Sequence, residues 1–262
     1  MEYLKINYKL SENVGIIKMD YSKNFNAMDT QMVNELLDAL DRAEKDEEVK
    51  VVIIRGGEKA FSAGGDLIAF KDSVVTNEYT EFEDADLIWQ VSEKIRRMPK
   101  IVLAEVAGVA AGAGASLAFS CDFIFSTEET KYIEAFVNVG LTPDMGGLYM
   151  MAKDLGWHKT LEYMILGEPI PANVLHEAGV IYKLVEKEKL SETTMEFAKK
   201  LSRGPTLAYG NNKKLLYKAV FKDYEDFHKV EYESSRDLAN TEDFKEAILA
   251  FAEKRKAEFK GK

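Results

Sequence analysis

Hydrophobic and polar positions alternate with two different periods along the chain. Short apolar or β-branched runs, typical of strands, occur at residues 14–19, 51–54, 101–104, 122–126 and 131–133. Longer segments with apolar residues three and four apart predict helices that start near Asp29 or Thr30 and cover residues 86–98, 115–120 and 147–155. This alternation over the first two-thirds of the chain predicts an α/β core.

The last third of the chain has a different pattern. From residue 159 onward the sequence predicts almost only helix, including segments 191–201, 206–222 and 223–238 and a basic terminal helix that ends at residue 259. No fixed-period repeat or low-complexity segment occurs. We therefore expect a core over residues 1–200 and a C-terminal helical region over residues 201–262.

Three glycine-rich turns interrupt this pattern, at residues 61–67, 108–114 and 140–147. The first two each follow a buried strand, and glycine lets a ligand approach the backbone because it has no Cβ. Two such turns can each direct one backbone N–H at a single point, which is the arrangement of an oxyanion hole. The alternative for the turn at 108–114 is a tightly packed strand-to-helix connection without a ligand.

Asp144 is the one carboxylate set in a Pro/Gly turn among apolar residues. As a helix N-cap it would accept hydrogen bonds from the N–H of Gly146 or Gly147. As a general acid/base it would have a pKa raised by an apolar pocket. The sequence leaves both roles open.

Ser116 lies in Gly-Ala-Ser-Leu-Ala, which lacks the second glycine of the nucleophile elbow. The three histidines, His158, His176 and His228, lie in polar helical settings, so a serine-hydrolase triad is only a minor alternative. No two of them are spaced to bind a metal on one face. We expect no metal site.

The composition limits the class of protein. The 262 residues are 46% hydrophobic and 31% charged, which is typical of a globular protein, and the formal net charge is −10. The negative charge argues against non-specific binding to nucleic acid or to an anionic membrane surface. The single cysteine, Cys121, excludes a disulfide framework, and its apolar helix favours a small core residue. The longest uncharged stretch falls short of the roughly 18 residues of a membrane span, so we expect a cytoplasmic protein without a membrane partner.

Several motifs together resemble the crotonase (enoyl-CoA hydratase/isomerase) superfamily over nearly the whole chain. They are the turns at residues 61–67, 106–117 and 140–147, together with Cys121-Asp122, residues 26–28, 166–172 and 177–180, and the ending at 251–259. This resemblance implies a spiral core of ββα units and a C-terminal helical trimerisation region. It implies homotrimers, often paired into hexamers, and an acyl-CoA ligand whose coenzyme A is part of the substrate, so no other cofactor is expected.

The resemblance also implies roles for individual residues. Gly65 and Ala113 would supply the two N–H donors of the oxyanion hole. The Ala63 carbonyl would receive the adenine amino group, Lys23 would meet CoA phosphates, and Phe251 and Lys254 would reach the CoA of a neighbouring subunit. Asp66, Leu67, Ser116 and Phe136 complete the expected substrate-binding set.

The chain departs from the hydratases of this superfamily at two positions. Hydratases hold and activate water with two glutamates, which correspond to Ser116 and Phe136, and neither residue can act as the required acid or base. Asp144 instead matches the position of the acid/base in ring-modifying phenylacetate-pathway isomerases, and Δ3,Δ2-enoyl-CoA isomerases of the peroxisomal type place a glutamate nearby. The resemblance therefore predicts an acyl-CoA isomerase with Asp144 as acid/base.

Other chemistry remains open at this stage. Asp144 could be the nucleophile of a dehalogenase-like enzyme or assist hydrolysis of a cyclic acyl-CoA, and the chain could be a weak hydratase or a non-catalytic CoA-ester binding protein. The polar segment 71–84 is expected to lie over the site and, with the helix from residue 86, to shape the acyl pocket. Neither the acyl group nor the choice between CoA and an acyl carrier protein follows from the sequence.

Overall fold

A six-stranded sheet forms the centre of the fold in the computed structural model, which describes residues 2–69, 71 and 83–262. In spatial order its strands are β1 (Ile6–Ser11), β2 (Val14–Met19), β3 (Val51–Arg55), β5 (Ile101–Val106), β7 (Phe123–Ser126) and β10 (Lys183–Leu184). Only the edge pair β1–β2 is antiparallel, and every other pairing is parallel. Parallel strands need long crossovers, which explains the helices that separate β3, β5 and β7 in sequence.

A smaller sheet carries the turns that concern the site. Its strands, in spatial order, are β4 (Ala60–Ser62), β6 (Val109–Ala111), β8 (Lys131–Ile133) and β9 (Ile170–Pro171). β4, β6 and β8 run parallel, so the turns after these three strands emerge at the same edge. The glycine turns that are distant in sequence are thereby brought together.

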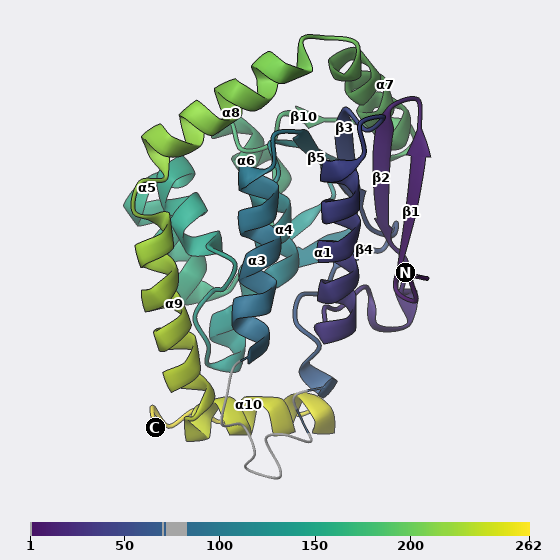
Figure 1. Cartoon of the computed structure of the whole chain (residues 1–262). Helices are drawn as coiled ribbons and strands as arrows, with labels where there is room; N and C mark the ends of the chain where they lie inside the picture. Colours follow the sequence, from purple (N-terminus) through teal and green to yellow (C-terminus); the bar gives the residue numbers. More distant parts are fainter. Residues whose placement is uncertain (1, 70, 72–82) are drawn as a thin grey trace.

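Helices cover both faces of the large sheet (Figure 1). α1 (Thr30–Lys45) and α3 (Glu83–Arg97) lie side by side on one face, and α7 (Leu190–Ser202) lies on the other. Alternate strand residues join different cores: Ile54 packs in the cluster of α1 and α3, whereas Ile53 packs in the cluster of α7. Burial on both faces is the reason why β3 is a continuous apolar run.

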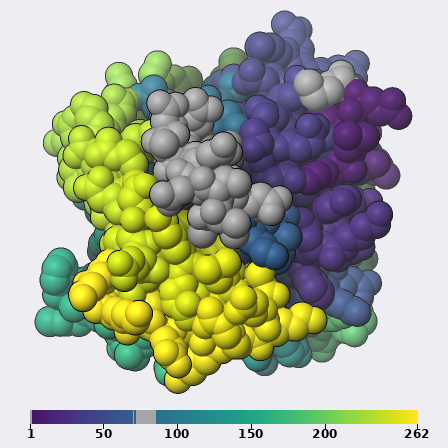
Figure 2. Space-filling view, turned by 90° about the horizontal axis from the view of Figure 1, so that it is seen from below, coloured from purple at the N-terminus to yellow at the C-terminus, as the bar shows by residue number. Residues whose placement is uncertain are grey.

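The remaining helical elements connect the sheets to the C-terminal region. They are η1 (Ser22–Asn24), α4 (Ala113–Ser120), η2 (Ala135–Val139), α5 (Gly147–Leu166), α6 (Ala172–Glu177), η3 (Lys187–Lys189), α8 (Thr206–Val220), α9 (Tyr224–Ala239) and α10 (Glu242–Glu253). α9 runs along one side of the molecule, and α10 crosses below α1 and α3 (Figure 1). Seen from below, α9 and α10 cover much of that face (Figure 2).

Most of the expected elements are present, and the α/β class is confirmed. Five strands were not predicted: β1, whose exposed residues break the apolar pattern, β4 and β6, which overlap the expected glycine turns, and β9 and β10, which are two residues each and lie where almost only helix was expected. The helix expected to end at residue 155 continues as α5 to Leu166 with a kink at Gly156. The division at residue 200 stays a prediction.

The terminal helix expected to reach residue 259 ends earlier. α10 stops at Glu253 because Lys254 adopts a left-handed backbone with φ 56°. The tail then folds back, and the N–H groups of Lys260 and Gly261 donate to the Asp243 carboxylate at 2.6 and 2.7 Å. Glu246, also on α10, accepts the N–H of Glu258 at 3.0 Å. The sequence pattern did not reveal this return because it depends on single carboxylates of α10.

Candidate active site

The first two glycine turns touch each other through their backbones. Gly64 has φ +88°, and a Cβ there would lie 2.6 Å from Ala111 O and 3.4 Å from Ala113 N. A Cβ at Gly114 would lie 2.6 Å from Ser62 O. Any side chain at these positions would push the turns apart, so glycine is what allows β4 and β6 to end in contact. The predicted pairing of the two turns is confirmed.

Each turn presents one backbone N–H without a partner. Among the described residues, neither Gly65 N nor Ala113 N donates to a protein acceptor. Gly65 is held by a parallel bridge to Met28, and Ala113 is the first residue of α4, where N–H groups have no intrahelical acceptor. Two free backbone donors from neighbouring turns, one of them at a helix start, can stabilise an oxyanion.

Phe136 forms an apolar wall beside these donors. Its side chain is 8% exposed, and its ring lies against Gly112, where a Cβ would be 3.6 Å from Phe136 Cζ. Its position in η2 is fixed because Leu141 N donates to Phe136 O at 3.0 Å. The wall carries no group that can activate water.

The third turn carries Asp144 and is held from several sides. Met145 has φ 55° and is completely buried, an uncommon backbone conformation for a non-glycine residue. The Tyr224 hydroxyl donates to Met145 O at 3.1 Å and also lies 2.9 Å from Ser92 Oγ. Gly146 N donates to Glu231 Oε2 at 3.0 Å. Residues of α3 and α9 thus fix the turn in an otherwise unfavourable shape.

Asp144 is not the N-cap of α5, so that alternative is wrong. The cap is Gly146, without a side-chain hydrogen bond. The Gly146 N–H is taken by Glu231, and the Gly147 N–H donates to the main-chain oxygen of Asp144 at 3.0 Å. Neither N–H group therefore donates to the Asp144 side chain.

The environment of Asp144 favours the protonated acid. Its Oδ1 is buried and has no hydrogen-bond partner within the described part of the chain. Burial raises the pKa of this carboxyl from 3.8 to about 7, against a smaller lowering by its own backbone. A carboxyl that titrates near neutrality can both accept and return a proton.

Two glutamates that the sequence did not reveal lie around the same turn. Glu134, just after β8, is 1% exposed, and Glu231, on α9, is 7% exposed. Burial, and next the charge of Asp144, raise the pKa of both carboxyls well above their usual value. A faint signal exists for Glu231, because Phe227, Glu231 and Ser235 share one face of α9; Glu134 follows the β8 strand and precedes an apolar run.

Ser116 is not part of a catalytic triad. It is completely buried, and no residue among those described hydrogen-bonds to its Oγ. His176 lies 2.9 Å from Ile181 O, and His228 lies 3.1 Å from Asp86 Oδ1. The serine-hydrolase alternative therefore lacks its base.

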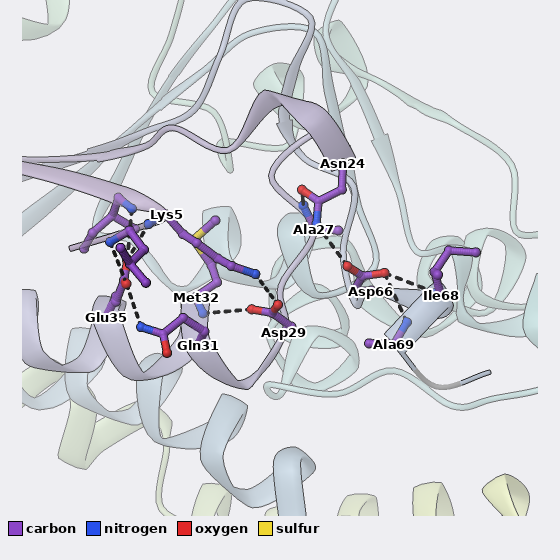
Figure 3. Close-up of polar contacts among 12 residues, drawn as sticks. Lys5, Asn24, Ala27, Asp29, Gln31, Met32, Glu35, Asp66, Ile68 and Ala69 are labelled. Atoms are coloured by element: carbon purple, nitrogen blue, oxygen red, sulfur yellow. Dashed lines mark hydrogen bonds and ion pairs between the residues drawn. The ribbon is translucent and has the colours of Figure 1, made fainter. Parts of the chain in front are cut away.

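The remaining predicted residues differ in their contacts and in their exposure to solvent. Asp66 caps the following turn: it accepts from Ile68 N at 3.1 Å and from Asn24 Nδ2 at 3.0 Å (Figure 3). Leu67 packs against the cluster of Phe244 on α10. The others lie at the surface: Lys23 and Ala63 are exposed, Phe251 is 53% exposed, and Lys254 ends α10. Their roles in binding CoA stay predictions, and most of segment 71–84 lies outside the described residues.

Three further observations concern other classes of site. Cys121 is buried with its pKa raised to about 12 by burial, which confirms the small core residue. Within the ranges that the structure describes, no three His, Cys, Asp or Glu residues are grouped to hold a metal ion. Over the same ranges, no helix has the length and apolar character needed to cross a bilayer.

The family model for enoyl-CoA hydratase/isomerase matches residues 9–262. The chain belongs to the enoyl-CoA hydratase/isomerase family. It is 33% identical to a trans-2-decenoyl-(acyl-carrier-protein) isomerase from Streptococcus mutans, with both chains covered completely. It is 28% identical to a 1,2-epoxyphenylacetyl-CoA isomerase from Escherichia coli, over 97% of each chain.

Solved structures show that the fold is that of the family. An enoyl-CoA hydratase from Mycobacterium avium subsp. paratuberculosis superposes with a TM-score of 0.88 at 24% identity, covering 99% of this chain and all of the other. A methylmalonyl-CoA decarboxylase in complex with 2-nitronate-propionyl-CoA gives a TM-score of 0.87 at 25% identity, with both chains covered completely. The recognition of the crotonase superfamily and of its fold is therefore confirmed. Members of this family include hydratases and isomerases.

Proposed function

We propose that this enzyme is an isomerase that moves a carbon–carbon double bond in an acyl thioester, with Asp144 as its acid/base. The observation that carries the proposal is the Asp144 carboxyl, which has a buried Oδ1 without a partner and a pKa raised to about 7. It belongs to a turn that packs on α4, the helix that begins with Ala113. A single carboxyl of this kind can serve both proton transfers of an isomerisation.

The reaction would begin with the thioester oxygen bound by Gly65 N–H and Ala113 N–H. The Asp144 carboxylate then removes a proton from a carbon next to the double bond, and the C–H electron pair moves into a dienolate. The negative charge of this dienolate develops on the thioester oxygen, where the two donors stabilise it. Protonated Asp144 finally returns the proton to the other end of the conjugated system, so the double bond has moved.

Hydration is disfavoured by the walls of the site. Ser116 and Phe136 stand where the resemblance places the hydratase glutamates, and Ser116 Oγ is buried without a hydrogen-bond partner among the described residues. The relatives named as isomerases support the same choice, although others are named probable enoyl-CoA hydratases.

The carrier of the acyl group forms part of the proposal. We propose an acyl-CoA substrate, with no separate cofactor, and a homotrimer or hexamer as the assembly. The Streptococcus mutans relative is named for an acyl-carrier-protein thioester, which makes this carrier the second candidate. Parallel assays with 3-enoyl-CoA and with the matching carrier-protein thioester decide between them.

The decisive experiment replaces Asp144 by asparagine and measures isomerisation of a 3-enoyl-CoA. We expect kcat to fall by at least about 10²-fold, the usual contribution of general acid–base catalysis. Asp154→Asn is the matched control, because Asp154 is another carboxylate of raised pKa but lies on the exposed side of α5, so its activity should be retained. Wild-type turnover by Asp144→Asn would refute the assignment. A product heavier by one water would show hydration instead of isomerisation.

The pH dependence gives an independent test. Asp144 must be ionised to accept the first proton, and its pKa is raised to about 7. We therefore expect kcat/KM to increase with pH up to about 7 and to level off above it. A profile that is flat between pH 5 and 8 would exclude Asp144 as the base.

A further inference from the structure

Three buried hydroxyl groups form a continuous row behind the Asp144 turn. Ser120 Oγ lies 2.8 Å from Ser92 Oγ, which lies 2.9 Å from the Tyr224 hydroxyl. That hydroxyl lies 3.1 Å from Met145 O. The three hydroxyl residues are completely buried. The row begins on α4, passes through α3 and α9, and ends on the residue that follows Asp144.

The protons of this row have only one order that makes every link. Met145 O is a main-chain oxygen and only accepts, so the Tyr224 hydroxyl must donate to it. A hydroxyl has one proton, so Ser92 must donate to Tyr224, and Ser120 to Ser92. Ser120 Oγ also lies 2.8 Å from Ser116 O, a second acceptor one turn earlier on α4. The row is therefore a directed hydrogen-bond chain from α4 to Met145 O.

The two ends of this hydroxyl chain belong to the two halves of the proposed site. α4 carries Ala113, the second donor of the proposed oxyanion hole, at its first position and Ser120 at its last. A helix transmits position between its ends because its backbone hydrogen bonds make it a rigid element. The hydroxyl chain thus links the helix that would bind the thioester oxygen to the turn that carries Asp144.

The hydroxyl chain meets the third turn at a peptide unit that is held at both of its polar atoms. The oxygen of the peptide between Met145 and Gly146 accepts from Tyr224. The N–H of the same peptide donates to Glu231 Oε2 at 3.0 Å, and Tyr224 and Glu231 lie seven positions apart on one face of α9. Met145 and Gly146 both have a left-handed backbone, with φ 55° and 72°. This conformation is unfavourable for methionine, so we expect the turn to change shape when the peptide is released.

The ring of Tyr224 is fixed independently of its hydroxyl. Its centroid lies 4.3 Å from that of Trp89 and 5.0 Å from that of Tyr149. Gly146 lies directly against the hydroxyl, because a Cβ at this glycine would overlap the Tyr224 oxygen. This packing directs the hydroxyl at the turn, and removal of the oxygen alone should leave the ring in place.

We propose that Tyr224 is a positioning residue for Asp144, and that the hydroxyl chain sets the position of Asp144 relative to the oxyanion hole. The inference rests on the proposed isomerase function. Tyr224 acts through Met145 O, because its hydroxyl is buried and directed at that atom. A misplacement of about 1 Å can slow a reaction by about 10²-fold, so an acid/base held in this way is sensitive to the loss of one hydrogen bond.

The experiment measures kcat and KM of full-length Tyr224→Phe with a 3-enoyl-CoA. We expect kcat to fall about 10-fold because the Asp144 carboxyl loses its fixed position. KM should change less than about twofold, because the N–H donors of Gly65 and Ala113 remain. Circular dichroism shows whether the variant is folded.

Tyr132→Phe is the matched control. Tyr132 is as completely buried as Tyr224, and its hydroxyl donates to Ser126 Oγ at 3.0 Å, outside the hydroxyl chain. The control therefore loses one buried hydroxyl group without releasing the third turn. Its kcat should remain that of the wild type.

A double variant separates positioning from general structural damage. When Asp144 is replaced by asparagine, no carboxyl remains to be positioned. Tyr224→Phe should therefore lower the residual kcat of Asp144→Asn by less than about twofold, against about 10-fold in the wild-type background. A purely structural role of Tyr224 would give the same factor in both backgrounds.

Ser92→Ala tests the middle of the hydroxyl chain and replaces Tyr224→Phe if that variant does not fold. It leaves the bond from Tyr224 to Met145 O but removes the connection to α4. We expect kcat to fall at least about threefold in the wild-type background and by less than about twofold in Asp144→Asn.

Three results would overturn the inference while leaving the isomerase function intact. They are wild-type kcat in folded Tyr224→Phe or Ser92→Ala, an equal decrease in Tyr132→Phe, and the same factor in both backgrounds. Wild-type turnover by Asp144→Asn alone would instead show that the proposed function fails, and this inference would fail with it.

Discussion

Two glutamates of this chain are equally buried and have opposite surroundings. Glu35 on α1 is 0% exposed, and Glu134 is 1% exposed. Glu35 accepts hydrogen bonds from the main chain of β1 and the residues before it and from one side chain, at 2.7–3.1 Å (Figure 3). The donors are Leu4 N, Lys5 N, Ile6 N and Gln31 Nε2. Glu134 has no hydrogen bond in the described structure.

The hydrogen bonds decide what burial does to each carboxyl. Burial alone raises the pKa of Glu35, but the donors around it outweigh burial and the pKa is lowered. Nothing offsets burial at Glu134, and its pKa is raised. A buried carboxylate surrounded by N–H donors anchors the chain, here β1 onto α1, whereas one without donors holds a proton. This difference separates a structural carboxyl from one available for chemistry.

Removing the two carboxyls should have unequal effects on stability. Glu35→Ala leaves the N–H groups of Leu4, Lys5 and Ile6 without their acceptor, and we expect a loss of about 3–5 kcal/mol in the free energy of unfolding. Glu134→Gln breaks no hydrogen bond and should be at least as stable as the wild type above neutral pH. Urea denaturation of both variants measures the difference, and equal losses would contradict the comparison.

The tight packing around Glu134 can be tested by a substitution at Gly147, the glycine that lies against it. Gly147→Ala places a methyl group onto Ser116 Oγ and 3.2 Å from Glu134 Oε1, and we expect a loss of about 1–3 kcal/mol through overpacking. Combining it with Ser116→Ala removes the hydroxyl in the way and should recover at least about 0.5 kcal/mol of that loss. Strict additivity in thermal unfolding of the single and double variants would show that Ser116 does not face Gly147.

A smaller effect is expected from Asp144, whose side chain is only partly buried. Its pKa rises from 3.8 to about 7 on folding, so the folded protein binds this proton more tightly and loses stability as pH increases between these values. Asp144→Asn removes this loss of stability. The free energy of unfolding of the variant should exceed that of the wild type by about 1–2 kcal/mol at pH 8, with little difference near pH 4. Unfolding at both pH values tests the sign, and a wild type that is more stable at pH 8 than Asp144→Asn would contradict it.

The sequence predicted the parts of the site that depend on local pattern. The glycines of the first two turns indicated close backbone contact, and Gly64 and Gly114 provide it. Asp144 stood out because a carboxylate in an apolar Pro/Gly turn is unusual. The same local reasoning also offered it as a helix cap, which is wrong because Glu231, which accepts the Gly146 N–H, lies 85 positions after Gly146 in the chain.

Neither the burial of Glu134 nor the strand β1 was predicted from the sequence, and the physical reason is the same for both. A charged residue next to a strand, or a strand with exposed residues on both faces, looks like ordinary surface in sequence. Whether Glu134 meets donors or apolar groups is decided by α4 and by the start of α5, which supply Ser116 and Gly147. Burial by segments distant in sequence leaves no local pattern.

The support of the Asp144 turn has a consequence for how far the chain can be shortened. Tyr224 and Glu231, which hold Met145 and Gly146, both belong to α9. A truncated protein ending near residue 200 would retain Gly65, Ala113 and Asp144 yet lose the two contacts that fix the last of these. The C-terminal helices are therefore part of the smallest unit that can be active, whatever they do in assembly.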